Sequence, residues 1–181
     1  MCRLTVVVHT FVASRRKRIE RRRQSVHHAL MKKRSVSTQF GELTLTEQDG
    51  AITALDWTRI AHDDASELLD KAAAQLAEYA AGTRESFDLP LRVAGSDFQR
   101  DVCALMSAIP FGYTRTYGEI ATDLGVPAQA VGQACGGNPI PVIIPCHRVM
   151  GAKGRTGFSG RGGGETKVAL LRHEKAAGLL I

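Results

Sequence analysis

Residues 141–149 read PVIIPCHRV: an apolar run lies between two prolines, and a cysteine and a histidine follow it directly. This pattern predicts a short buried strand over residues 142–144 that delivers Cys146 at its end. A thiol in that place is either an inert core group or a nucleophile. His147 favours the nucleophile, because a reactive thiolate needs a proton acceptor or a positive charge nearby. Adjacent residues of an extended segment point in opposite directions, so a water molecule would have to bridge the two side chains.

A carboxylate that could orient His147 lies near the end of the chain. Residues 167–176 have the pattern of an amphipathic helix that carries Glu174. If this carboxylate reached His147, it would hold one tautomer of the imidazole and favour its charged form, as the acid of a catalytic triad does. An exposed glutamate is the ordinary alternative.

Two short helices are predicted upstream, over residues 117–124 and 128–135, with Gly-Val-Pro between them. Ala121, Gly125 and Val131 have the spacing of the small, turn and core positions of a helix-turn-helix. A helical hairpin that binds no DNA shows the same spacing, so both interpretations stay open.

The second of these helices carries mostly small side chains and two glutamines. Gly132 within it costs about 1 kcal/mol relative to alanine, which indicates close approach of another molecule or tight packing on the protein's own sheet. Small side chains are poorly equipped to read base edges in a major groove. A smooth helix of this kind suits a narrow groove better.

The preceding part of the chain predicts a small α/β lobe. Apolar positions alternate over residues 36–45 and 51–57 with the turn sequence QDG between them, which predicts a β-hairpin. Residues 64–81 predict a helix that ends at Gly82. A short strand near residues 87–93 would complete the lobe.

A further helix is predicted to begin after this lobe. Ser96 followed by Gln99 resembles a capping box, and the helix runs through Met106. Cys103 falls on its apolar face, where a buried structural thiol is expected.

The charge is unevenly distributed along the 181 residues, whose net charge is +6. Residues 1–34 hold eleven Lys and Arg against Glu20 alone, residues 35–109 hold five against thirteen Asp and Glu, and residues 110–181 hold eight against four. The net charges of these parts are +10, −8 and +4. A polyanion would therefore meet the C-terminal part of the globular region.

Residues 1–34 form a basic segment with too little apolar content to fold alone. We interpret it as a disordered arm that adds phosphate affinity, or as an extension upstream of a true start at Met31, with an organellar transit peptide as a third possibility. The apolar run over residues 4–13 is too short to span a bilayer. Its arginine cluster follows the run, whereas a secretory signal has its charge in front.

The four cysteines lie far apart with no Cys-x-x-Cys pair, which favours neither a disulfide framework nor a zinc ribbon. We expect reduced thiols, a cytoplasmic protein, and neither a metal nor a cofactor.

Five blocks of residues, in their order and spacing, resemble the methylated-DNA–protein-cysteine methyltransferase family, also called O6-alkylguanine-DNA alkyltransferases. They are residues 110–121 (PFGYTRTYGEIA), 130–132 (AVG), 138–149 (NPIPVIIPCHRV), 157–160 (GFSG) and 170–174 (LLRHE). The match is dense over residues 96–175 and looser from Val36 onward.

The resemblance implies an α/β fold with three parts. After the basic arm of residues 1–34, residues 36–94 would form a ribonuclease H-like lobe of sheet and helix, and residues 95–178 a mostly helical domain with a helix-turn-helix. The partner would be double-stranded DNA that carries O6-alkylguanine, with O4-alkylthymine as a second candidate base. The protein would act as a monomer without a membrane.

The reaction implied is a single transfer. The damaged nucleotide is rotated out of the duplex, Cys146 attacks the alkyl carbon as a thiolate, and the thioether product has no hydrolytic exit. His147, Glu174 and a water would remove the thiol proton. Asn138 would shape the turn beside the cysteine, and Tyr117 would help to rotate the nucleotide and donate a hydrogen bond to the base.

The resemblance also assigns binding residues. The DNA-contacting set comprises Tyr117, Ala128, Gln129, Ala130, Gly132 and Arg148. The base pocket would be lined by Cys135, Val149, Phe158, Ser159 and Gly160.

Two features depart from the family pattern. Gln129 stands where the family usually has an arginine that enters the base stack; glutamine can hydrogen-bond the orphaned base but lacks the planar cation. We therefore expect weaker DNA binding or slower repair than in an arginine-bearing relative. The stretch 161–166 is longer than is usual.

Three other functions compete with alkyl transfer. An alkyltransferase-like sensor would bind damaged bases and recruit repair factors without chemistry, but such relatives commonly have tryptophan in place of the nucleophile, and Cys146 is intact. A helix-turn-helix regulator would need side chains that read bases, which the second helix lacks. A cysteine hydrolase could be proposed from Cys146 and His147 alone, but the surrounding blocks do not resemble one.

Overall fold

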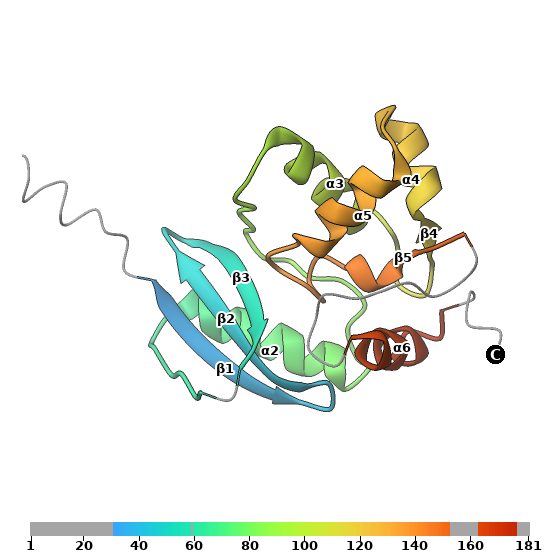
Figure 1. The fold of residues 1–181 in the computed structure, drawn as a ribbon. Coiled ribbons are helices and arrows are strands. Elements are labelled where there is room, and N and C mark those ends of the chain that lie inside the picture. The colour runs from blue at the N-terminus through green and yellow to red at the C-terminus, as the bar shows by residue number, and fades with distance from the viewer. Residues whose placement is uncertain (1–30, 59, 153–162, 177–181) are drawn as a thin grey trace, which may run out of the picture. The chain divides into compact units, whose positions relative to one another are not determined.

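The N-terminal lobe is a three-stranded antiparallel sheet with one helix packed on it. This computed structural model describes residues 31–58, 60–152 and 163–176, and Figure 1 shows their arrangement. The sheet has the order β1-β2-β3, and helix α2 packs against all three strands. The bounds are Lys32–Thr38 for β1, Gly41–Gln48 for β2, Ala51–Trp57 for β3 and Glu67–Ala80 for α2. Buried leucines of the sheet and the helix belong to one core: Leu43, Leu45, Leu55, Leu69 and Leu76.

The chain divides into two units, Met1–Met31 and Lys32–Ile181, and every element named here belongs to the second. Most of the predicted basic arm lies outside the described residues. Three of the predicted pocket residues also lie outside them: Phe158, Ser159 and Gly160.

The prediction of one strand over residues 36–45 is wrong, because a two-residue turn divides it into β1 and β2. The Thr38 hydroxyl closes this turn: it donates to the Gly41 carbonyl at 2.9 Å and accepts from the Phe40 amide at 3.2 Å. Gly41 has a φ of 110°, which glycine adopts readily. The alternation of apolar residues continues across so tight a turn, so periodicity did not reveal it. The predicted turn between β2 and β3 is present.

Helix α2 ends as predicted. The Gly82 amide, at φ 75°, donates to the Tyr79 carbonyl, and the Thr83 amide donates to that of Glu78, the pattern of a Schellman motif.

The predicted strand over residues 87–93 is absent; Leu91 makes one isolated bridge to Ile52. Gln75, buried on α2, holds this connection instead. Its amide nitrogen donates to the Asp88 carbonyl at 3.2 Å, and its amide oxygen accepts from the Asp88 amide at 2.9 Å. A side chain thus replaces the strand pairing that Pro90 would interrupt.

In the part of the C-terminal lobe that the structure describes, four α-helices surround a short parallel strand pair. The predicted helix-turn-helix segments are helical, and the α/β fold class with a helical second domain is confirmed. None of the helices in the described ranges is long and apolar enough to cross a membrane. The elements are α3 (Asp97–Ser107), β4 (Arg115–Thr116), α4 (Tyr117–Leu124), α5 (Ala128–Gly136), β5 (Val149–Met150) and α6 (Gly164–His173).

Helix α3 begins at Ser96, whose hydroxyl accepts from the Gln99 amide at 3.2 Å, and Cys103 is buried on its inner face as expected. The predicted capping box is wrong in one of its two hydrogen bonds, the one that the Gln99 side chain would make with the Ser96 backbone. The Gln99 side chain donates to the Ala134 carbonyl of α5 at 2.8 Å and so ties two helices together. The complete capping box is formed by Thr116 and Glu119, at the start of α4.

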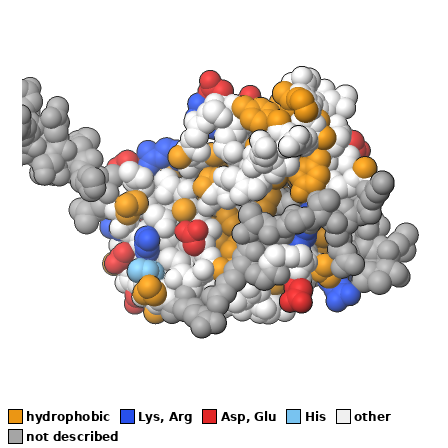
Figure 2. Space-filling view, in the orientation of Figure 1, with side chains coloured by type: hydrophobic (Ala, Val, Ile, Leu, Met, Phe, Trp, Pro, Cys, Tyr) orange, Lys and Arg blue, Asp and Glu red, His pale blue; other side chains and the backbone are white. Residues whose placement is uncertain are grey.

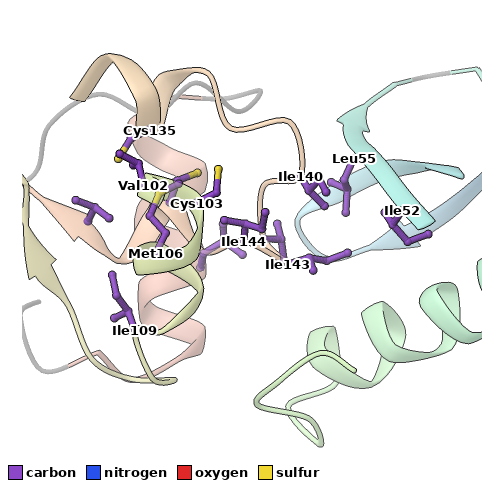
Figure 3. Packing of buried hydrophobic residues seen from close by; sticks show 14 of the residues in the cluster. Ile52, Leu55, Val102, Cys103, Met106, Ile109, Cys135, Ile140, Ile143 and Ile144 are labelled. Carbon is purple, nitrogen blue, oxygen red and sulfur yellow. The ribbon is translucent and has the colours of Figure 1, made fainter. Parts of the chain in front are cut away.

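The two lobes meet around the segment that precedes Cys146. Ile140, Ile143 and Ile144 are buried and extend toward the sheet, with Ile140 beside Leu55 (Figure 3). The Leu55 amide donates to the Pro139 carbonyl at 2.9 Å. The backbone that leads to the cysteine is therefore anchored on the N-terminal sheet.

Replacement of Gln75 by alanine tests how the connection between the lobes is held. We expect Gln75→Ala to lower the free energy of unfolding by about 1–3 kcal/mol, because both backbone groups of Asp88 lose their partner. Urea denaturation measures this, with Gln133→Ala on the exposed side of α5 as the control. Equal stability of the two variants would contradict it.

Candidate active site

The backbone before Cys146 forms a turn, and the predicted strand over residues 142–144 is wrong. The Ile144 amide donates to the Ile140 carbonyl at 2.8 Å, and Val142 has a φ of 73°. Asn138 closes the turn from inside: its amide nitrogen donates to the Ile144 carbonyl at 2.8 Å, and its oxygen accepts from the Ile140 amide at 3.0 Å. The segment is buried, so its backbone groups need such partners, which a lone extended strand would not have.

Cys146 starts a single 3-10 turn, η1 (Cys146–Arg148), and is 4% exposed. The extended geometry expected around the cysteine is thus absent, and the backbone instead turns tightly between the thiol and His147. His147 is fully buried, and its Nδ1 atom has no hydrogen-bond partner among the described residues. A direct hydrogen bond from His147 Nδ1 to the thiol is therefore not made.

Glu174 follows the last residue of α6 as its cap and is buried, although a glutamate there is ordinarily exposed. Its Oε1 atom lies 2.7 Å from His147 Nε2. Arg148 donates to both oxygens, from Nε to Oε2 at 2.8 Å and from Nη2 to Oε1 at 3.0 Å. The structure therefore brings together Glu174 and His147, which the sequence placed 27 residues apart.

The charges of this network follow from its contacts. Burial opposes ionisation of Glu174, but the hydrogen bonds from His147 and Arg148 outweigh it and lower the pKa to about 2. Burial lowers the pKa of His147 below its usual 6.5, against the opposing effect of Glu174. Near neutral pH the carboxylate is charged and the imidazole neutral. Nε2 then carries the hydrogen that Glu174 accepts, which leaves Nδ1 as a proton acceptor.

The Cys146 thiol is protonated at rest. Burial raises its pKa, while a hydrogen bond with Asn138 and the charge of Lys167 act in the opposite direction. Lys167 was not singled out by the sequence. It is 1% exposed, and its ammonium donates to the Val149 carbonyl at 2.6 Å. The sequence did contain a signal for its burial: Lys167 lies on the same face of the predicted helix as Leu170, Leu171 and Glu174.

Arg148 does not have the predicted DNA-contacting position. Its side chain is 7% exposed. Besides Glu174, the guanidinium donates to the Ile109 carbonyl at 2.6 Å and lies 5.9 Å from the centre of the Phe111 ring. Sequence cannot distinguish an arginine that meets phosphate from one that neutralises a buried carboxylate.

Other predicted pocket residues lie around the cysteine. Burial, with Cys146 as the next cause, raises the pKa of the Cys135 thiol to about 12. Val149 is buried and pairs with Arg115 in the parallel β4–β5 ladder. Tyr117 follows β4 directly, so this ladder brings it to the segment that follows the cysteine.

The second helix of the helix-turn-helix presents an open face. Ala128 and Gln129 are exposed, and Ala130 and Gly132 are partly exposed. A Cβ atom on Gly132 would meet no described atom within 4 Å, so packing on the protein's own sheet does not explain this glycine. Figure 2 shows mainly uncharged atoms where Figure 1 places α4 and α5.

A cavity of about 200 Å³ lies on the Arg148 side of the site. Its lining includes Phe87, Phe111, Pro145 and Arg148 but neither Cys146 nor Tyr117. The described residues predicted for the base pocket, Cys135 and Val149, are not part of its lining.

The fold and the site define a two-lobed α/β protein whose helical lobe carries a buried cysteine and histidine, and comparison with known proteins specifies the family. Residues 31–93 match the ribonuclease-like domain, and residues 97–176 the DNA-binding domain, of 6-O-methylguanine DNA methyltransferases. The chain belongs to this family.

Individual relatives agree with this assignment. The methylated-DNA–protein-cysteine methyltransferase of Mycolicibacterium paratuberculosis is 40% identical over 161 residues, which cover 82% of this chain and 96% of the relative. The crystal structure of the Mycobacterium tuberculosis O6-methylguanine methyltransferase has a TM-score of 0.72 at 39% identity, covering 81% of this chain and 93% of that one. A structure of Mycobacterium tuberculosis OGT in complex with DNA has a TM-score of 0.72 at 41% identity, covering 82% and 97%.

Loss of the Arg148 guanidinium should destabilise the fold. We expect Arg148→Met to lower the free energy of unfolding by about 3–5 kcal/mol, because it leaves a buried carboxylate without its cation. The control is Arg100→Met, which removes an exposed ion pair with Asp97 and should cost at most about 1 kcal/mol. Denaturant titration of both variants decides it, and an equally small loss in both would refute the expectation.

Proposed function

We propose that Cys146 accepts one alkyl group from O6-alkylguanine in double-stranded DNA and keeps it. The chain is a methylated-DNA–protein-cysteine methyltransferase by family, and it repairs DNA by direct reversal. The observation that carries the assignment to Cys146 is the geometry of the adjacent His147: its Nε2 atom lies 2.7 Å from Glu174, and its Nδ1 atom has no partner among the described residues.

The transfer begins with removal of the thiol proton. In our proposal it passes through a bridging water to His147 Nδ1, while the Nε2 hydrogen stays on the imidazole and is donated to the Glu174 carboxylate, whose charge stabilises the imidazolium. The charge of Lys167 favours the thiolate thus formed. Burial disfavours each charge alone, so the thiolate and the imidazolium are expected to form as a pair.

The thiolate sulfur then attacks the alkyl carbon. A sulfur–carbon bond forms as the carbon–O6 bond breaks, and the electron pair leaves with the guanine, which regains a proton. A donor aimed at O6 lowers the barrier as charge accumulates there, and Tyr117 is our candidate. The thioether has no leaving group that water can displace, so each molecule reacts once and needs no cofactor.

DNA would be met by α5, whose small side chains allow close approach to a narrow groove. Gln129 is exposed near the start of this helix, and in our proposal its side chain occupies the space that the rotated nucleotide leaves. All groups used belong to one chain, so we expect a monomer to suffice.

The direct test is incubation with a duplex that contains O6-methylguanine, followed by mass spectrometry. We expect one adduct per molecule, equal to a methyl group replacing hydrogen, on the peptide that contains Cys146. Cys103→Ser should retain the adduct and Cys146→Ser should lose it, because Cys146, unlike Cys103, directly precedes His147 in the chain. Unmodified Cys146 after prolonged exposure, with DNA binding retained, would favour a sensor that performs no chemistry.

Gln129→Arg should improve handling of the damaged nucleotide. A stacked guanidinium contributes about 0.5–2 kcal/mol, which corresponds to a roughly 2- to 30-fold faster single-turnover transfer at limiting protein. Gln129→Lys adds the same charge without the planar fork and should gain less. Equal gains in both variants would assign the effect to charge alone, and no gain in either would contradict the role given to this position.

A further inference from the structure

A third donor reaches Glu174 from the N-terminal lobe. The Tyr79 hydroxyl, on α2, donates to Glu174 Oε1 at 2.7 Å across 95 residues of sequence. This is the same oxygen that accepts from His147 Nε2 at 2.7 Å and from Arg148 Nη2 at 3.0 Å. Tyr79 is therefore linked, through one shared carboxylate oxygen, to the histidine that would take the thiol proton.

The position of the Tyr79 ring is fixed by aromatic neighbours from both lobes. Phe40 and Phe87 lie 6.1 Å and 5.5 Å from it between ring centres, and Phe111 and His173 lie 6.2 Å and 5.1 Å away. The Nε2 atom of His173 also lies 2.7 Å from the Tyr79 carbonyl oxygen. Because the ring is held in this way, the hydroxyl stays within hydrogen-bonding distance of Glu174.

Packing alone does not require this hydroxyl. A phenylalanine would fill the same space, and a buried hydroxyl costs free energy unless it is hydrogen-bonded. The partner that satisfies this hydroxyl is Glu174 Oε1, the same oxygen that forms the hydrogen bond with His147. Burial, and next the charge of Glu174, raise the pKa of Tyr79, so the phenol stays protonated and remains a donor over the whole physiological range.

We propose that Tyr79 is a positioning residue of the alkyl transfer, through which the N-terminal lobe sets the basicity of His147 by competing for Glu174 Oε1. The inference rests on the proposed function of Cys146.

The sign of the effect follows from the shared oxygen. The donation from Tyr79 withdraws negative charge that would otherwise stabilise a protonated His147. The other groups that face the pair do not change with Tyr79: Arg148 and the Gly112 amide bind Glu174, and Lys167 repels a charged imidazole. Without the phenol, the pKa of His147 should rise. The imidazole would then stay protonated up to a higher pH, and while protonated it cannot accept the thiol proton.

The test is the pH dependence of single-turnover transfer from an O6-methylguanine duplex between about pH 5 and pH 9. In the wild-type protein we expect the acid limb below the usual histidine value. In Tyr79→Phe it should move to higher pH by roughly half a unit to one unit, so that at pH values below both limbs the rate falls about 3- to 10-fold. The alkaline plateau should stay at or above that of the wild type, because the base is stronger.

Tyr113→Phe is the matched control. Tyr113 is 65% exposed in the loop before β4 and should leave the acid limb unmoved. A ring-fluorinated tyrosine at position 79 keeps the shape and strengthens the donor, and should move the limb to lower pH. This second variant tests the proposal even if Tyr79→Phe folds poorly.

The outcomes separate two failures. If the wild-type protein transfers the methyl group and both position-79 variants keep the wild-type acid limb, or lose rate equally at every pH, Tyr79 has only a structural role and the inference is overturned. If the wild-type protein forms no adduct, the proposed function itself fails.

Discussion

The buried carboxylate of Glu174 is the group on which the rest of the site depends. An ionised carboxylate is stable away from water only when donors approach it from several directions. Here the donors are Tyr79 from the N-terminal lobe and His147 and Arg148 from the turn that begins at the cysteine. Because they come from separate parts of the chain, the charge can be buried only when the two lobes and α6 have come together. Buried ion pairs contribute little net stability, which makes a role in orienting His147 the better explanation.

Burial alone does not distinguish the three described cysteines. Cys103, Cys135 and Cys146 are all buried, and burial raises the pKa of each thiol. What sets Cys146 apart is that His147 follows it and that a hydrogen bond with Asn138 favours its thiolate, whereas the charge of Lys167 acts on both Cys135 and Cys146. A thiol that is protonated at rest and activated by a neighbouring base is protected from unrelated reactions, which suits a protein that reacts once.

Several features could be predicted from sequence because they depend on neighbours in the chain. The helix-turn-helix segments, the N-cap at Ser96 and the helix end at Gly82 follow from local patterns, and all are present. Other predictions were wrong where a tertiary contact decided the backbone. The apolar run before Cys146 has the composition of a strand, but Asn138 holds it in a turn. Periodicity likewise could not show the turn between β1 and β2.

The sequence by itself determined the class of fold and the family, because the order and spacing of motifs can be read without knowledge of contacts. Only the tertiary structure decided the partners of His147. It turned Arg148 from an expected DNA contact into a counter-ion, buried Lys167 beside the thiols, and brought Tyr79 to Glu174. The physical reason is that a side chain's charge and accessibility depend on what packs around it, and these neighbours come from segments far apart in the chain.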